Sequence, residues 1–153
     1  MTYWKLYYHL VWSTKLRVPS LQGEQVTELQ RAIWKSVEDL KIQLHALGIQ
    51  QDHVHVAYSA PPSLSIADVA QRLKGSSSHY LGKQFPGDWP GWQKEYGVVG
   101  VGQQSLPRVV AYVNNQAEHH REQTLWLEME RGLDDPVELS SAADPSPIGT
   151  YDN

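Results

Sequence analysis

The chain has 153 residues and a mass of 17.3 kDa, the size of one compact domain. It contains no cysteine, which excludes disulfides, thiolate metal sites and cysteine nucleophiles. No apolar stretch reaches the roughly 18 residues of a membrane-spanning helix, and the first residues lack the pattern of a secretory signal. We therefore expect a cytoplasmic protein without a membrane segment.

The net charge of −4 is unevenly distributed. Residues 1–125 carry 12 Lys and Arg against 10 Asp and Glu, whereas residues 126–153 carry one against seven. The body of the chain is therefore slightly basic, and the acidity belongs mainly to the C-terminal end. This balance neither requires nor excludes a phosphate-bearing partner.

The first predicted element is a strand over residues 3–13, where two rows of side chains alternate with period two. A loop with proline and glycine follows. Apolar residues at steps of three and four then predict a helix over residues 24–41. Two short strands come next, over residues 42–48 and 53–59, with a polar turn between them.

A second helix is predicted over residues 65–81, because its first residues have the spacing of a capping box. A turn-rich segment leads to a predicted strand over residues 94–101. Ser105 is expected to cap a third helix that runs to about Arg131 and has proline near its first turn.

This order of elements predicts an α+β protein of the ferredoxin-like type. Such a fold has an antiparallel sheet with helices packed on one face, here followed by a C-terminal helix that carries a tyrosine. Residues 1–131 form the predicted domain. Residues 132–153 are acidic, contain three prolines and show little periodicity, so we expect a disordered tail.

Two histidines stand two positions apart in the strand over residues 53–59. Because alternate residues of a strand point the same way, His53 and His55 present both imidazoles on one face, while Val54 and Val56 enter the core. Two neutral imidazoles on one rigid strand form half of a divalent-metal site. The alternative is that both histidines simply lie on a solvent-facing side of the strand.

The third helix offers further candidates. Tyr112 and Gln116 are four residues apart and therefore share one helical face. The amide oxygen of Gln116 can bind a hard cation. The alternatives are that Tyr112 packs against the sheet and Gln116 is solvated, or that His119 and His120, one turn further on, are the ligands.

Several basic residues could contact phosphates. Lys15 and Arg17 lie in the loop after the first strand, and Arg72 and Lys74 lie in the second helix before three serines. The second pair could equally belong to a solvated helix end. Six tryptophans and eight tyrosines could stack on unpaired bases, although aromatic side chains more often form the core.

Taken together, these motifs identify a family. In their order along the chain they resemble the single-strand insertion-sequence transposases, and their REP-associated relatives, which have one catalytic tyrosine and the HUH (His-hydrophobic-His) motif. The resemblance covers about residues 3–131. The segments that carry it are Tyr8–Lys15, Asp52–His55, Arg72–Ser78, Trp92–Gly97 and Tyr112–Arg121.

The resemblance implies a role for each candidate of the site. His53 and His55 would be two metal ligands, Gln116 the third, and Tyr112 the nucleophile. The metal would be Mg²⁺ or Mn²⁺, and manganese matches nitrogen ligands better. Attack by the tyrosine would leave a covalent 5′-phosphotyrosine and a free 3′-hydroxyl, and reversal of this step would join strands without ATP.

The resemblance also implies partners. The substrate would be single-stranded DNA with hairpins at the element ends, and the protein would be a homodimer in which the tyrosine helix of one subunit completes the site of the other. Lys15, Arg17, Arg72 and Lys74 are the candidate DNA-binding residues. Two alternatives stay open: a domesticated or inactive protein that only binds single-stranded nucleic acid, and a metal-dependent hydrolase of small phosphoesters that does not need Tyr112.

Overall fold

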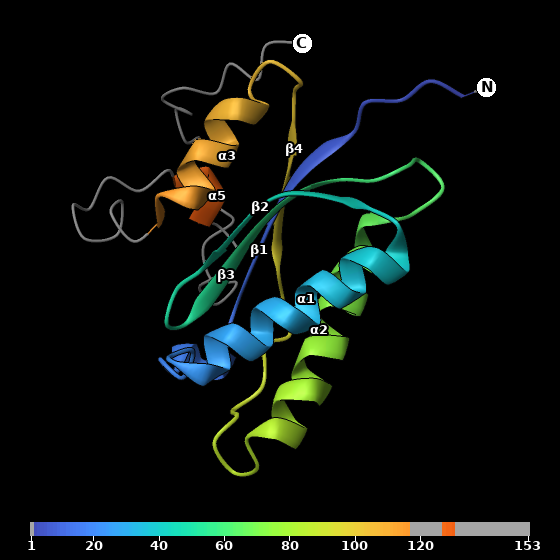
Figure 1. The fold of residues 1–153 in the computed structure, drawn as a ribbon. Coiled ribbons are helices and arrows are strands. Elements are labelled where there is room, and N and C mark those ends of the chain that lie inside the picture. Colours follow the sequence, from blue (N-terminus) through green and yellow to red (C-terminus); the bar gives the residue numbers. More distant parts are fainter. Residues whose placement is uncertain (1, 117–126, 131–153) are drawn as a thin grey trace.

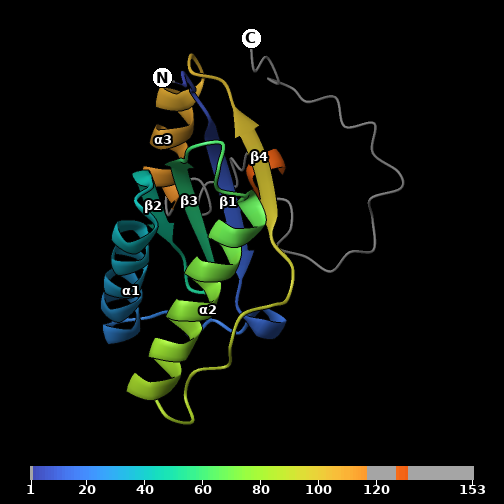
Figure 2. The same ribbon diagram turned by 90° about the vertical axis from the view of Figure 1, so that its right-hand side faces the viewer.

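The computed structural model of this chain describes residues 2–116 and 127–130. One antiparallel sheet, in the order β2-β3-β1-β4, lies between two layers of helices (Figures 1 and 2). Its strands are β1 (Tyr7–Ser13), β2 (Gln43–Ile49), β3 (His53–Ser59) and β4 (Gly97–Val101). The helices are η1 (Lys15–Arg17), α1 (Glu24–Leu40), α2 (Ile66–Gln84), α3 (Leu106–Asn114) and α5 (Leu127–Glu130). The predicted α+β fold is confirmed.

The larger core lies between the sheet and the helices α1 and α2. Alternation along β1 and β3 sends Leu10, Trp12, Val54 and Val56 to this face, where all four are fully buried. Each large apolar side chain buried here stabilises the fold by about 1.5–3 kcal/mol. This layer therefore holds most of the hydrophobic stabilisation.

The opposite face of the sheet carries a smaller core under α3 and α5. Its members are mainly small or β-branched, which lets the two helices approach the strands closely: Ala46, Ala57, Val101, Val109, Tyr112, Val113 and Met129. Helix α3 lies against β2 and β3, and α5 lies against β1 and β4. Three buried histidines, His9, His53 and His55, share this face.

The structure shifts several predicted boundaries. The first strand begins at Tyr7, and α2 continues to Gln84, although its predicted start is correct because the Ser65 hydroxyl accepts a hydrogen bond from the backbone N–H of Asp68 at 3.0 Å. Strand β4 begins only at Gly97. The backbone carbonyls of residues 93–95 accept hydrogen bonds from the ammonium of Lys74, so they face a side chain instead of a neighbouring strand.

The third helix departs most from its prediction. It ends at Asn114, because Asn115 has φ −106° and ψ 23°, outside the α-helical region. Within the described residues Ser105 makes no side-chain cap, since its backbone is itself near-helical and not extended as a capping residue requires. His119, His120, the boundary at Arg131 and the predicted tail lie outside the described residues. None of the helices described is long and apolar enough to cross a bilayer.

Candidate metal and tyrosine site

The two histidines of β3 lie side by side beneath α3. Their ring centroids are 5.0 Å apart, and the residues His53 and His55 are 1% and 0% exposed. Val54 and Val56 point to the opposite face, as predicted. The alternative of a solvent-facing pair is therefore wrong.

A second residue fixes each imidazole. The Nδ1 atom of His53 lies 2.7 Å from an Asp52 carboxylate oxygen, and the Nδ1 atom of His55 lies 2.8 Å from Nε2 of His9. These contacts hold the rings through Nδ1, so both Nε2 atoms point toward the same space. If His55 uses the Nε2 lone pair on a cation, its Nδ1 carries the proton and donates to His9.

The surroundings set the charges of these supporting groups. Burial by itself would raise the pKa of Asp52, but the hydrogen bonds from His53 and Arg17 outweigh it and lower the pKa to about 2. Burial and the neighbouring His55 lower the pKa of His9 well below its ordinary value. Asp52 is therefore a carboxylate and His9 a neutral imidazole at neutral pH.

Glu130 of α5 links the histidine pair to the tyrosine. One of its oxygens, Oε2, lies 3.5 Å from Nε2 of His53 and 3.2 Å from Nε2 of His55. The other oxygen, Oε1, accepts a hydrogen bond from the Tyr112 hydroxyl at 2.7 Å. One ligand atom from each of His53, His55 and Glu130 lies within 4.8 Å of the others, which is compatible with a shared cation.

Glu130 is ionised in this position. Burial favours the neutral acid and would raise its pKa, but the hydrogen bonds and charges of His55, together with the Tyr112 hydroxyl and His53, lower the pKa to about 2. A buried carboxylate between two imidazoles and a phenol supplies the anionic oxygen that hard divalent cations prefer.

The position of Tyr112 depends on a close approach between α3 and β2. Gly48 of β2 pairs with His55, and a Cβ atom at Gly48 would lie only 2.6 Å from the backbone oxygen of Val113. Because only glycine leaves room for the helix, Tyr112 can come near the histidines: its ring centroid lies 6.2 Å from that of His55. The tyrosine thus meets the histidine pair of its own chain.

Gln116 lies just after α3 and is 1% exposed, so the alternative of a solvated side chain is wrong. Gly48 is the residue of β2 that pairs with His55, and a Cβ atom added to Gly48 would lie 3.3 Å from the Cγ atom of Gln116. The residue is therefore in the neighbourhood of the site. Its role as third metal ligand stays a prediction.

The four candidate DNA-binding residues fall into two groups. Arg17 contacts Asp52 at 3.0 Å and Lys15 is exposed in the same turn, so this pair lies next to the site. Lys74 donates to three backbone carbonyls at 2.8–3.1 Å, and its position in α2 belongs to the other face of the sheet. Such an ammonium already has a structural partner for each of its three N–H donors.

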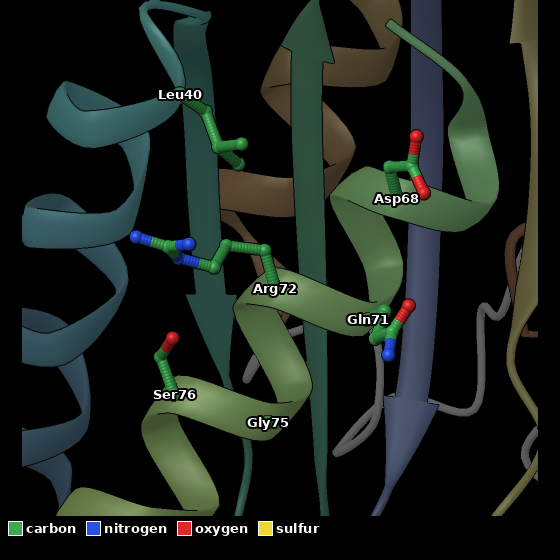
Figure 3. A pocket seen from close by; sticks show the side chains of 6 residues that line it. All are labelled: Leu40, Asp68, Gln71, Arg72, Gly75 and Ser76. Carbon is green, nitrogen blue, oxygen red and sulfur yellow. The ribbon is translucent and has the colours of Figure 1, made fainter.

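Arg72 also belongs to α2, where its guanidinium lies 3.5 Å from a carboxylate oxygen of Asp39. Arg72 lines a surface pocket between the helices α1 and α2 (Figure 3). The other lining residues are Leu40, Asp68, Gln71, Gly75 and Ser76. Both basic residues of α2 are thus separated by the sheet from the histidines.

Three residues of the site escaped sequence reasoning. His9 lies on the same face of β1 as Val11 and Ser13, and the period of the strand predicts that face. The period does not predict the contact of His9 with His55. Asp52 was visible only as the neighbour of His53. Glu130 is 75 positions beyond His55 and was assigned to one long helix, so no local pattern marked it.

Comparison with known proteins finds relatives that are transposases. The family model described as "Transposase IS200 like" matches residues 2–116. The ISDra2 transposase TnpA of Deinococcus radiodurans is 27% identical over 119 residues, which cover 74% of this chain and 85% of that protein. The transposase for insertion sequence element IS200 of Salmonella typhimurium is 30% identical over 132 residues, covering 78% and 82%.

Solved structures agree with the sequence relatives. A crystal structure from Deinococcus radiodurans, of a protein assigned as a transposase, superposes with a TM-score of 0.62 at 30% identity and covers 75% of this chain and 93% of its own. A REP-associated tyrosine transposase bound to a REP hairpin superposes with a TM-score of 0.60 and covers 78% and 74%. At 17% identity the second likeness shows a shared fold.

Proposed function

This chain belongs to the IS200-like transposase family, and on that premise we propose that it cuts and rejoins single-stranded DNA with Tyr112 as nucleophile. The observation that carries the proposal is the Glu130 carboxylate, which contacts the Tyr112 hydroxyl with one oxygen and both histidine Nε2 atoms with the other. This contact supports a nucleophile next to a cation site.

The donor set suits a divalent cation. His53 and His55 supply two imidazole nitrogens and Glu130 a carboxylate oxygen, while Gln116 is a candidate for a further oxygen. This mixture of nitrogen and oxygen fits Mn²⁺ and Mg²⁺. When bound, such a cation offsets the negative charge that gathers on a phosphodiester under attack.

The residues of this chain supply the remaining chemistry. The Tyr112 oxygen bonds to the scissile phosphorus, the bond from phosphorus to the 3′-oxygen breaks, and the 3′-oxygen leaves with a proton from solvent. The tyrosine proton leaves to solvent, while Glu130 Oε1, the hydrogen-bond acceptor 2.7 Å away, orients the hydroxyl. The 5′-phosphotyrosine replaces one phosphodiester by another, so the reverse step can join a new 3′-end.

The test is a substitution that removes only the reacting atom. Tyr112→Phe keeps the ring in its apolar packing and should bind DNA with unchanged affinity, yet form no covalent adduct with a single-stranded oligonucleotide on a denaturing gel. Adduct formation by the wild-type protein should stop on addition of a chelator and return with Mn²⁺. An adduct on Tyr112→Phe would refute the assignment of the nucleophile.

A different outcome would favour the non-catalytic alternative. A wild-type protein that binds the oligonucleotide equally with and without chelator, and never forms an adduct, would be a binding module on the same fold. His55→Ala is then expected to leave the affinity unchanged. Turnover of a small phosphoester by Tyr112→Phe would instead favour the hydrolase.

We further propose a hairpin-containing strand as the substrate. The support is the structural relative bound to a REP hairpin, which shares this fold. For the predicted homodimer with exchanged tyrosine helices, mixing Tyr112→Phe with His55→Ala protein is the test. If the tyrosine helices are exchanged, mixed dimers should regain activity. If each subunit forms its own site, mixed dimers should stay inactive.

A further inference from the structure

A short turn next to the histidine pair exposes a large apolar side chain. Turn η1 follows the end of β1 (Figure 1), and Leu16 at its centre is 86% exposed. Leu16 and Arg17 have φ of 55° and 57°, the left-handed region that favours glycine. A leucine that gains nothing from burial and sits in a disfavoured conformation indicates a role outside folding.

The turn is firmly held. The Thr14 backbone N–H donates to the Asp52 carbonyl at 2.8 Å, and the Thr14 hydroxyl donates to the Val18 carbonyl at 2.7 Å. The N–H of Lys15 donates to the Gly91 carbonyl at 2.9 Å. These bonds on both sides of Leu16 fix the direction in which the turn presents its side chains.

A carboxylate connects the turn to the site. One oxygen of Asp52 accepts from the Arg17 guanidinium at 3.0 Å, and the other contacts His53 Nδ1 at 2.7 Å. Ser13, two residues before the turn begins, is the register partner of His53. The turn therefore stands at the end of the sheet where the candidate cation would be held.

We propose that η1 binds the unpaired DNA next to the scissile phosphate, with the Leu16 side chain packed against a base and the exposed Lys15 ammonium paired with a backbone phosphate. This inference rests on the proposed function and names the part of the substrate that the turn contacts. Unpaired bases offer apolar faces that a duplex hides in its stack, so an exposed leucine beside a cation favours single-stranded DNA. Arg17 is a positioning residue, since its guanidinium is directed to Asp52.

The test compares two substrates for the full-length protein in the presence of a chelator, so that only binding is measured. Fluorescence anisotropy gives the affinity for a hairpin with an unpaired extension and for the same hairpin with a blunt end. Leu16→Gly should weaken binding of the extended hairpin about five- to tenfold and leave the blunt hairpin unchanged. Lys15→Gln should remove one phosphate contact, and the slope of log affinity against log salt concentration should fall in magnitude by about one.

Glycine accepts the left-handed conformation, so Leu16→Gly should melt at the same or a higher temperature than the wild type, which excludes unfolding as the cause. The matched control is Trp34→Ser, which removes another exposed apolar side chain, 50% exposed on α1, and should change neither affinity. Equal losses on both hairpins, an unchanged affinity, or the same loss in Trp34→Ser would overturn the inference.

The two proposals fail separately. If the wild type never forms an adduct but Leu16→Gly selectively loses the extended hairpin, the transferase proposal is wrong and the turn still binds the strand. If the adduct forms and Leu16→Gly binds as tightly as the wild type, only the role of the turn is wrong. A wild-type protein without affinity for either hairpin would overturn both.

Discussion

Replacement of Gly48 by alanine tests how the tyrosine reaches the histidines. The new Cβ would lie 2.6 Å from the backbone oxygen of Val113, whereas real Cβ atoms essentially never approach below 3.0 Å and make ordinary contacts from 3.4 Å. The difference between these distances requires α3 and β2 to separate by 0.4–0.8 Å. The obstacle is backbone, so no side-chain rotation can avoid this movement.

The displacement is large on the scale of the site. The Tyr112 hydroxyl is 2.7 Å from Glu130, and a shift of this size would stretch that bond to the limit of a hydrogen bond or beyond it. Overpacking of this kind costs about 1–3 kcal/mol of stability. Misplacement of a nucleophile by up to 1 Å lowers the rate of adduct formation by about 10- to 100-fold.

Single-turnover adduct formation and urea unfolding measure the two effects. The control is Gly100→Ala in β4, also a strand glycine, where an added Cβ meets nothing within 4 Å among the described residues. Gly48→Ala should lose both stability and rate relative to this control. If the two variants behaved alike in both assays, the close approach of α3 would not be what positions Tyr112.

Three further predictions concern stability. Gly75→Ala, at an exposed position inside α2 where an added Cβ meets no described atom within 4 Å, should raise the free energy of unfolding in urea by about 0.5–1 kcal/mol. Tyr58→Phe removes a buried hydroxyl that has no hydrogen-bond partner among the described residues, so urea unfolding should show an increase of up to about 1 kcal/mol. The surroundings of Asp52 lower its pKa from 3.8 to about 2, so the ionised carboxylate stabilises the fold at neutral pH. This contribution to the free energy of unfolding should disappear as the pH falls from about 5 toward 2. Since Asp52 is partly exposed, we expect Asp52→Asn to lose only about 1 kcal/mol at pH 7 and almost nothing near pH 2, measured by urea unfolding at each pH.

Each of these has a contrary result. A loss of stability in Gly75→Ala would mean that α2 is not a regular helix at this point. A loss in Tyr58→Phe larger than 1 kcal/mol would mean that the hydroxyl is well satisfied. A difference between wild type and Asp52→Asn that stays constant with pH would mean that ionisation of Asp52 does not contribute.

The strands and their faces could be predicted because they depend on local patterns. The bounds of β3 are correct to the residue, since a polar turn precedes His53 and two prolines follow shortly after Ser59. Alternation then assigned His53 and His55 to one face and the valines to the other, as the structure has them. The helical stripe of α1 was as clear, and its end differs by one residue.

The remaining features depend on contacts between distant segments. The hydrogen bonds of Lys74 are one example, because nothing in its own helix indicates that the backbone carbonyls of residues 93–95 accept from its ammonium. Glu130 lies against the histidines because α5 packs on β1 and β4, and no local pattern of residues indicates these contacts. The end of α3 at Asn114 is likewise not marked by a residue pattern.

The sheet separates the larger apolar core of this protein from its candidate site. Trp12 and Val54 belong to the larger core, between the sheet and the helices α1 and α2. His53, Tyr112 and Glu130 meet on the opposite face, under α3 and α5. Substitutions at separated positions usually have independent effects on stability. A substitution at the candidate site therefore need not destabilise the larger core. We therefore expect a chain with a substitution at Tyr112 or Glu130 to keep its larger core, so that retention of the fold and retention of activity are separate properties.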